Sequence, residues 1–88
     1  MGCARHYLKI LPEYFDAVLS GKKTFEVRYN DRDFKEGDLL ILEEYSVFDF
    51  LYTGRTVCVK VTYILDNPDF VKKGYVILGI KKVEEMKK

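Results

Sequence analysis

The sequence lacks any long apolar run, and this absence excludes one class of protein at the start. Its longest apolar stretches, such as residues 39–42, are far shorter than the roughly 20 residues that a membrane-spanning helix needs. The first residues also lack the order of positive, apolar and small residues that marks a secretory signal. We therefore expect a cytoplasmic protein with no membrane partner.

Cysteine and histidine are scarce, which argues against disulfide and metal sites. The chain has two cysteines, Cys3 and Cys58, and one histidine, His6. Two such cysteines do not form a disulfide framework, and we expect both thiols to be reduced. One histidine with these cysteines does not supply a zinc ligand set, so we predict no metal and no cofactor.

The chain also has little net charge, only +1 at pH 7. Overall electrostatics therefore does not indicate a nucleic-acid-binding protein, and an anion site must come from a local cluster of lysine and arginine. Apolar residues make up 48% and charged residues 33% of the 88 residues, as in a soluble globular domain. With no repeat and no linker, we predict one domain over residues 1–88, with a core at about 5–81 and frayed ends.

Periodicity predicts five strands and one early helix. The helix begins at Pro12, where the missing N–H has no intrahelical partner, and ends before Gly21, which suits a left-handed C-cap. Strands are expected at residues 6–10, 24–29, 38–45, 55–65 and 75–83. Between them lie a polar loop anchored by Phe34, an aromatic loop at residues 46–54 and a turn at residues 67–69.

Alternation predicts which side chains face the core. We expect the inward residues to be His6, Leu8 and Ile10 in the first strand, Phe25, Val27 and Tyr29 in the second, and Val57, Val59, Val61 and Tyr63 in the fourth. The apolar face of the helix is expected to contain Leu11, Tyr14, Phe15, Val18 and Leu19. These elements indicate the α+β class, as a small mixed β-barrel with the helix beside one opening, because closure protects the edges of so small a sheet.

The most informative segment is residues 21–28, GKKTFEVR, where the helical period changes to a period of two. If Phe25 and Val27 face the core, Glu26 and Arg28 share the opposite face with Cβ atoms about 7 Å apart, and Lys23 in the turn can lean over that face. Arg28 would then clamp a phosphate or carbonyl oxygen, and Glu26 would accept from the exocyclic amine of a base or shuttle a proton. The alternative is a solvated turn with a surface ion pair of little energetic value.

The order of strand, helix and this segment resembles the ASCH domain family, named for a domain of the activating signal cointegrator, within the PUA-like superfamily. The family signature G-x-K-x-x-E-x-R matches Gly21, Lys23, Glu26 and Arg28, and the similarity extends over about residues 5–80. Over this length the chain resembles a subgroup of small bacterial and phage proteins of unknown function. The resemblance implies a barrel of five or six strands, with a cleft between helix and barrel that is lined by the signature residues and binds RNA or a nucleotide-like ligand.

The same resemblance leaves enzymatic activity open. Some small family members are thought to hydrolyse the amide of acylated cytidines, and others have been proposed to cut RNA. In a hydrolase of this kind, Lys23 would serve as nucleophile or base, together with Glu26. The cytidine-hydrolysing members carry a threonine at the position of Glu26 and take their glutamate from further along the chain. This sequence departs from that pattern, so binding is favoured over hydrolysis.

Four further residues are candidate ligand contacts, each with a structural alternative. His6 opens onto the cleft or is a satisfied, partly buried histidine. Arg32 adds an anion contact or pairs with the aspartates of its own loop. Tyr52 and Arg55 supply stacking and phosphate contacts, or merely flank a hairpin turn at residues 53–54. The aromatic loop contacts a protein partner or, as we favour, extends a hairpin that packs on the barrel. The leading hypothesis is an RNA- or nucleotide-binding domain, followed by a small hydrolase and then by a protein-interaction domain.

Overall fold

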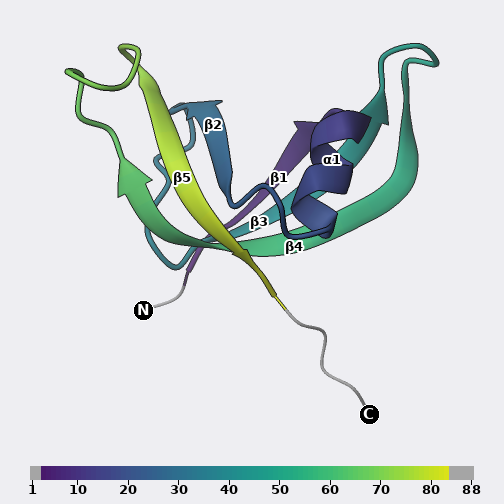
Figure 1. Cartoon of the computed structure of the whole chain (residues 1–88), viewed down its shortest axis with the longest axis horizontal. Helices are drawn as coiled ribbons and strands as arrows, with labels where there is room; N and C mark the ends of the chain where they lie inside the picture. The colour runs from purple at the N-terminus through teal and green to yellow at the C-terminus, as the bar shows by residue number, and fades with distance from the viewer. Residues whose placement is uncertain (1–2, 84–88) are drawn as a thin grey trace.

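Residues 3–83 form one curled sheet with a single helix against its inner side (Figure 1). The computed structural model describes residues 3–83. The strands are β1 (Arg5–Ile10), β2 (Phe25–Tyr29), β3 (Leu39–Ser46), β4 (Leu51–Leu65) and β5 (Tyr75–Lys82), and the helix is α1 (Pro12–Leu19). The charged end at residues 84–88, which was expected to fray, lies outside the described residues. No helix within residues 3–83 is long and apolar enough to cross a membrane.

The strand order β1-β3-β4-β5-β2 curls into a half-barrel (Figure 1). β1 pairs with β3 in parallel, and the other three pairs are antiparallel. The prediction of a small, barrel-like α+β fold with five strands is confirmed. The sheet stops short of a closed barrel, because β1 and β2 form its two edges and no backbone ladder joins them within residues 3–83. We call the gap between these two edge strands the seam.

The core fills the concave face of the sheet. Its buried residues are Leu8, Ile10, Leu40, Leu42, Val57, Val59, Val61, Val76, Leu78 and Ile80 from the sheet, with Phe15, Val18 and Phe34. Phe34 therefore anchors the loop between β2 and β3, as predicted. In α1 only Phe15 and Val18 are buried, because an eight-residue helix presents one narrow stripe to the sheet. The helix-face residues that remain partly exposed, contrary to expectation, are Leu11, Tyr14 and Leu19.

The predicted orientation of β2 is wrong. Glu26 is only 4% exposed, whereas Phe25 and Val27 are 45% and 50% exposed. The register with β5 explains this reversal, because Glu26 lies directly opposite the core residue Leu78, and directly opposed residues point to the same face. Glu26 and Arg28 do share a face, as expected, but it is the concave one. The residues of β2 that point outward are Phe25, Val27 and Tyr29.

Two irregularities in β4 also change predicted side-chain directions. The register with β5 shifts between Val61 and Tyr63, so that Tyr63, which was expected inward, is 62% exposed. The register with β3 shifts between Glu43 and Tyr45, where β4 contributes extra residues. Gly54 lies in this bulge with a φ of 96°, in the left-handed region that glycine adopts readily. The predicted hairpin turn at residues 53–54 is therefore a bulge within a strand.

The aromatic segment forms the end of the β3–β4 hairpin, whose turn occupies residues 47–50. The predicted hairpin extension is confirmed, and Figure 1 shows it rising past α1. The expectation that its tip packs on the sheet is wrong, since Phe48 and Phe50 are 91% and 76% exposed. This exposed apolar tip is the feature that a protein-partner hypothesis requires.

Candidate functional site

A pocket of about 450 Å³ lies at the seam, beside the start of α1. This volume falls within the range of roughly 300–1,000 Å³ that is common for small-molecule sites. The residues that line it are Lys9, Ile10, Leu11, Tyr14, Lys23, Phe25, Glu26, Val27 and Arg28. The three charged residues singled out in the sequence signature therefore converge on one concave site.

Glu26 is the centre of the polar contacts in this pocket. Lys23 Nζ donates to its Oε1. Arg28 Nε donates to its Oε2 over 3.0 Å, and Arg28 Nη2 lies 2.8 Å from the same oxygen. A nearly buried carboxylate needs such partners, because an unpaired charge in an apolar site is costly. We call Lys23, Glu26 and Arg28 the charged triad.

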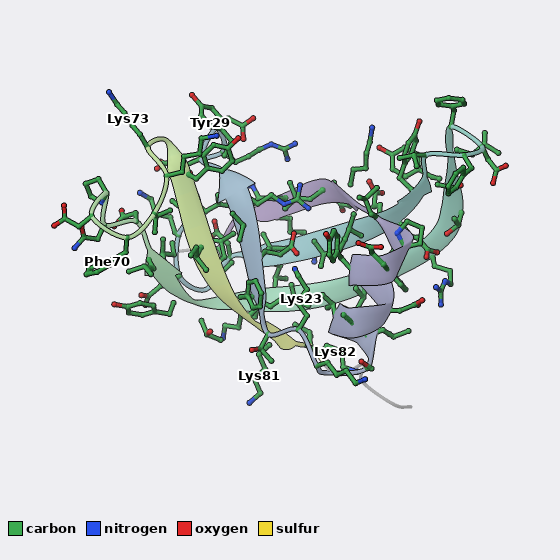
Figure 2. All side chains as sticks on the ribbon, turned by 45° about the horizontal axis from the view of Figure 1, so that its top comes forward. Lys23, Tyr29, Phe70, Lys73, Lys81 and Lys82 are labelled. Atoms are coloured by element: carbon green, nitrogen blue, oxygen red, sulfur yellow. The ribbon has the colours of Figure 1, made fainter. Side chains whose placement is uncertain are left out.

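The turn after α1 sets the direction of Lys23. Gly21 has a φ of 87°, and the Lys23 N–H donates to the carbonyl of Ala17 over 3.0 Å. The Lys23 side chain consequently lies between α1 and β2 (Figure 2). There its ammonium donates to the Phe25 carbonyl over 2.8 Å as well as to Glu26. Both partners are acceptors, so two of the three ammonium donors are used and one is left for a ligand.

Two arginines bridge the seam. Arg28 Nη2 donates to the carbonyl of Lys9 over 2.7 Å, and Arg32 Nη1 donates to the carbonyl of Tyr7 over 3.2 Å. Carbonyls two residues apart on a strand point to the same edge, so both acceptors lie on the edge of β1 that faces β2. Side-chain donors thus occupy the positions where a closed barrel would have backbone donors. Arg32 does not line the pocket.

His6 lies at the other end of β1 and does not line the pocket. Its Nε2 is 2.8 Å from Asp38 Oδ2, and its ring packs edge-on against Phe34. Burial of Asp38 opposes its ionisation, but hydrogen bonds from His6 and from the N–H groups of Lys35 and Ala4 lower the pKa of this carboxyl below its usual value. His6 is thus a hydrogen-bonded, buried histidine that joins β1 to the start of β3.

Arg55 also lies outside the pocket, where it ties α1 to the sheet. Its Nε is 2.9 Å from Glu44 Oε1, and its Nη2 is 2.9 Å from Asp16 Oδ1 on α1. Hydrogen bonds to Glu44 and Asp16 raise the pKa of Arg55, and hydrogen bonds from Arg55 and Thr53 lower the pKa of the Glu44 carboxyl. Tyr52 is half exposed and likewise does not line the pocket.

Sequence reasoning missed much of the pocket wall. Leu11 is the N-cap residue of α1 and Tyr14 lies in its first turn, but the sequence pattern assigned both to the apolar face that packs on the core. The residues around Lys9 in the sequence do not indicate that it lines a pocket, because Lys9 approaches β2 only across the seam. The buried Glu44 was also missed, although a carboxylate inside an apolar strand is a signal that a partner must be nearby.

The pocket combines apolar walls with a small number of polar groups. The Lys23 ammonium lies 5.6 Å from the ring centroid of Tyr14 and 4.9 Å from that of Phe25. Two partly exposed aromatic rings therefore flank the charged triad, which offers the acceptor oxygens of Glu26 and the remaining donor of Lys23. Within residues 3–83, no group of three or more His, Cys, Asp or Glu is placed to hold a metal ion. This arrangement suits a flat, polar-edged ring.

Comparison with known proteins gives the chain a family. It is similar to the "Uncharacterized 12.9 kDa protein in GpA 3'region" of Escherichia phage P2, with 41% identity over 73 residues. The match covers 83% of this chain and 64% of the phage protein, so the chain spans less than two thirds of that relative's length. Residues 5–80 match a family model described as "Domain of unknown function (DUF3850)". Because this match covers most of the chain, including the whole pocket, the chain belongs to the DUF3850 family.

Proposed function

We propose that the pocket binds the base of a nucleotide or of a single-stranded RNA. The observation that carries the proposal is a nearly buried carboxylate with aromatic rings beside it in one pocket: Glu26, with Tyr14 and Phe25. Stacking of a base on an aromatic ring contributes about 1–3 kcal/mol. A carboxylate accepts from the exocyclic amine of a base, which fixes the orientation of the stacked ring.

The charged triad also offers hydrogen bonds to the edge of a base. The Glu26 carboxylate has about four lone-pair sites, and the contacts with Lys23 and Arg28 leave at least one of them for a ligand N–H. The unused donor of Lys23 is next to that site. Cytosine and adenine match such a pair with their amine and adjacent ring nitrogen, and uracil matches it with its N3–H and an adjacent carbonyl oxygen. We therefore assign the pocket no preference among these bases.

The resemblance to the ASCH domains supports the same function. We propose that the chain is an ASCH-like member of the PUA-like superfamily, acting in the cytoplasm. In that family the cleft between helix and barrel is proposed to bind RNA or a nucleotide-like ligand, and here Lys23 lies between α1 and β2 and donates to Glu26 of β2.

Hydrolysis of an acylated cytidine is a second candidate, because Lys23 and Glu26, the two residues it would use, lie together in one pocket. Such a reaction needs Lys23 to act as a base or nucleophile. Both of its present partners are acceptors, so the contacts use Lys23 as a donor and oppose that role. Turnover of acylated cytidine by the wild type, and its loss in Lys23→Ala, would establish the hydrolase instead.

Binding of CMP, AMP and UMP at low salt, followed by isothermal titration calorimetry, tests the proposal. Tyr14→Ala removes a stacking wall and should weaken CMP binding roughly 5- to 150-fold, the fold-change that corresponds to loss of one stacked base. Tyr14 is 45% exposed, so its removal leaves the core intact. Tyr63→Ala is the matched control, because Tyr63 is an exposed tyrosine outside the pocket.

Two results would reject the proposal. One is the absence of binding by the wild type to any of the three nucleotides. The other is an equal loss of affinity in Tyr14→Ala and Tyr63→Ala, which would place the ligand outside the pocket.

A further inference from the structure

An aromatic and basic strip continues from the pocket across the sheet. Lys9 lines the pocket, and its ammonium lies 4.1 Å from the ring centroid of Tyr45 and 6.0 Å from that of Tyr52. The two tyrosine rings pack edge to face, with centroids 5.1 Å apart. These three residues come from β1, β3 and β4, which are neighbours in the sheet. We call Lys9, Tyr45 and Tyr52 the outer strip.

The outer strip lies on the convex face and contributes nothing to the core. Lys9 alternates with the buried Leu8 and Ile10, so its side chain points away from the concave side. Tyr52 is 54% exposed. Among the ion pairs of residues 3–83, none involves Lys9, although Glu43 is its register partner on β3. The ammonium is therefore available to an anion.

We propose that the outer strip is a second nucleotide subsite, so that the protein binds a single-stranded nucleic acid in preference to a free nucleotide. This inference rests on the proposed function of the pocket. Lys9 borders both places, and its ammonium contacts the phosphate that joins the nucleotide in the pocket to the next one. Tyr52 offers its exposed ring to the neighbouring base, and Tyr45 supports that ring edge-on.

The length of the ligand separates this role from a structural one. If Lys9 and Tyr52 only stabilise the hairpin through their cation–π contact, then their loss changes stability and affects all ligands alike. If they form a subsite, then the affinity of the wild type rises from one nucleotide to two, by roughly 5- to 150-fold for one added stacked base. Loss of Tyr52 removes this gain and leaves mononucleotide binding unchanged.

The experiment compares CMP with cytidine oligonucleotides of two to four units, as RNA and as DNA, by isothermal titration calorimetry. The proteins are the wild type, Tyr52→Ala, Lys9→Gln and the control Tyr63→Ala. We expect Tyr52→Ala to bind CMP like the wild type but to lose the gain with length. Lys9→Gln should reduce the slope of log affinity against log salt by about 0.7 for the oligonucleotides, the value for one phosphate contact on a single strand. A preference for RNA over DNA at equal length would indicate a contact to the 2′-hydroxyl.

The outcomes distinguish the two proposals. Equal wild-type affinity for CMP and for the oligonucleotides, or equal behaviour of Tyr52→Ala and Tyr63→Ala, overturns the second subsite and leaves the pocket proposal standing. Absence of both mononucleotide and oligonucleotide binding overturns both. If Tyr14→Ala does not weaken oligonucleotide binding, the pocket does not bind the base. The proposed path of the nucleic acid from the pocket to the outer strip is then also wrong.

Discussion

Replacing Glu26 by glutamine tests the charged triad as a structural unit. The variant keeps the shape of the side chain but removes the charge that Lys23 and Arg28 share. Removing one partner of a buried ion pair costs about 3–5 kcal/mol, because the remaining charge is left buried without compensation. Here the Lys23 and Arg28 side chains retain 15% and 23% exposure, so water partly solvates them. We therefore expect a smaller loss, of about 2–3 kcal/mol in the free energy of unfolding.

Urea denaturation followed by circular dichroism measures this loss, and thermal unfolding should show a Tm lower by about 10–20 °C. Asp33→Asn is the matched control, since it makes the same carboxylate-to-amide change in a pair with Lys35 where Asp33 is 83% exposed. The control should change stability by less than about 0.5 kcal/mol. If Glu26→Gln has an effect as small as that of Asp33→Asn, the triad is only a surface ion pair and the reasoning is refuted.

Two further predictions concern parts of the fold outside the pocket. Because the folded protein lowers the pKa of Asp38, the stabilisation by this carboxylate is complete above its unfolded value near 3.8 and is lost as pH falls through the folded value. In urea denaturation, the difference in free energy of unfolding between wild type and Asp38→Asn should therefore be constant from about pH 5 to 7 and become smaller below about pH 4. A difference that stays constant at all pH values would contradict the assigned hydrogen bonds of the Asp38 carboxylate. Gly74→Ala should destabilise the protein by about 1–2 kcal/mol. Gly74 has a φ of 84°, and an added Cβ would lie 2.8 Å from Cε1 of Tyr29. A Cβ at Gly54 would meet nothing within 4 Å, so Gly54→Ala should lose less free energy of unfolding in the same assay.

The strands and the helix could be predicted from the sequence because each depends on local pattern. Pro12 and Gly21 delimited the helix, and alternation identified the buried face of β1 and Val57, Val59 and Val61 of β4. Alternation shows that the apolar and charged side chains of β2 lie on opposite faces, but it does not show which of these two faces is turned to the core. The register with β5 decides that orientation, and it is a non-local property. The bulges of β4 were unpredictable for the same reason, because one extra residue reverses every later side chain.

The charged triad was predictable and its surroundings were not. Lys23, Glu26 and Arg28 are close in sequence, so the period of two and the turn were enough to bring them together. The wall contributed by Lys9 and Ile10 depends on β1 reaching β2 around the curl of the sheet. Arg55 looked like a phosphate ligand because its partners Glu44 and Asp16 lie far away in the chain. A charged residue is assigned to a ligand too easily when its internal partner is distant in sequence.

The bridging of the seam by arginines has a consequence for how the pocket can adapt. A backbone ladder holds two strands at a separation of about 4.8 Å, whereas a guanidinium on a flexible stem keeps its hydrogen bond over a range of separations. Arg28 of β2 and Arg32 of the loop that follows it therefore tether this part of the chain to β1 without imposing one width. We expect the separation of β1 and β2, and with it the width of the pocket, to change when ligands of different size bind. The core on the concave face should keep its packing, and the two arginine hydrogen bonds should persist.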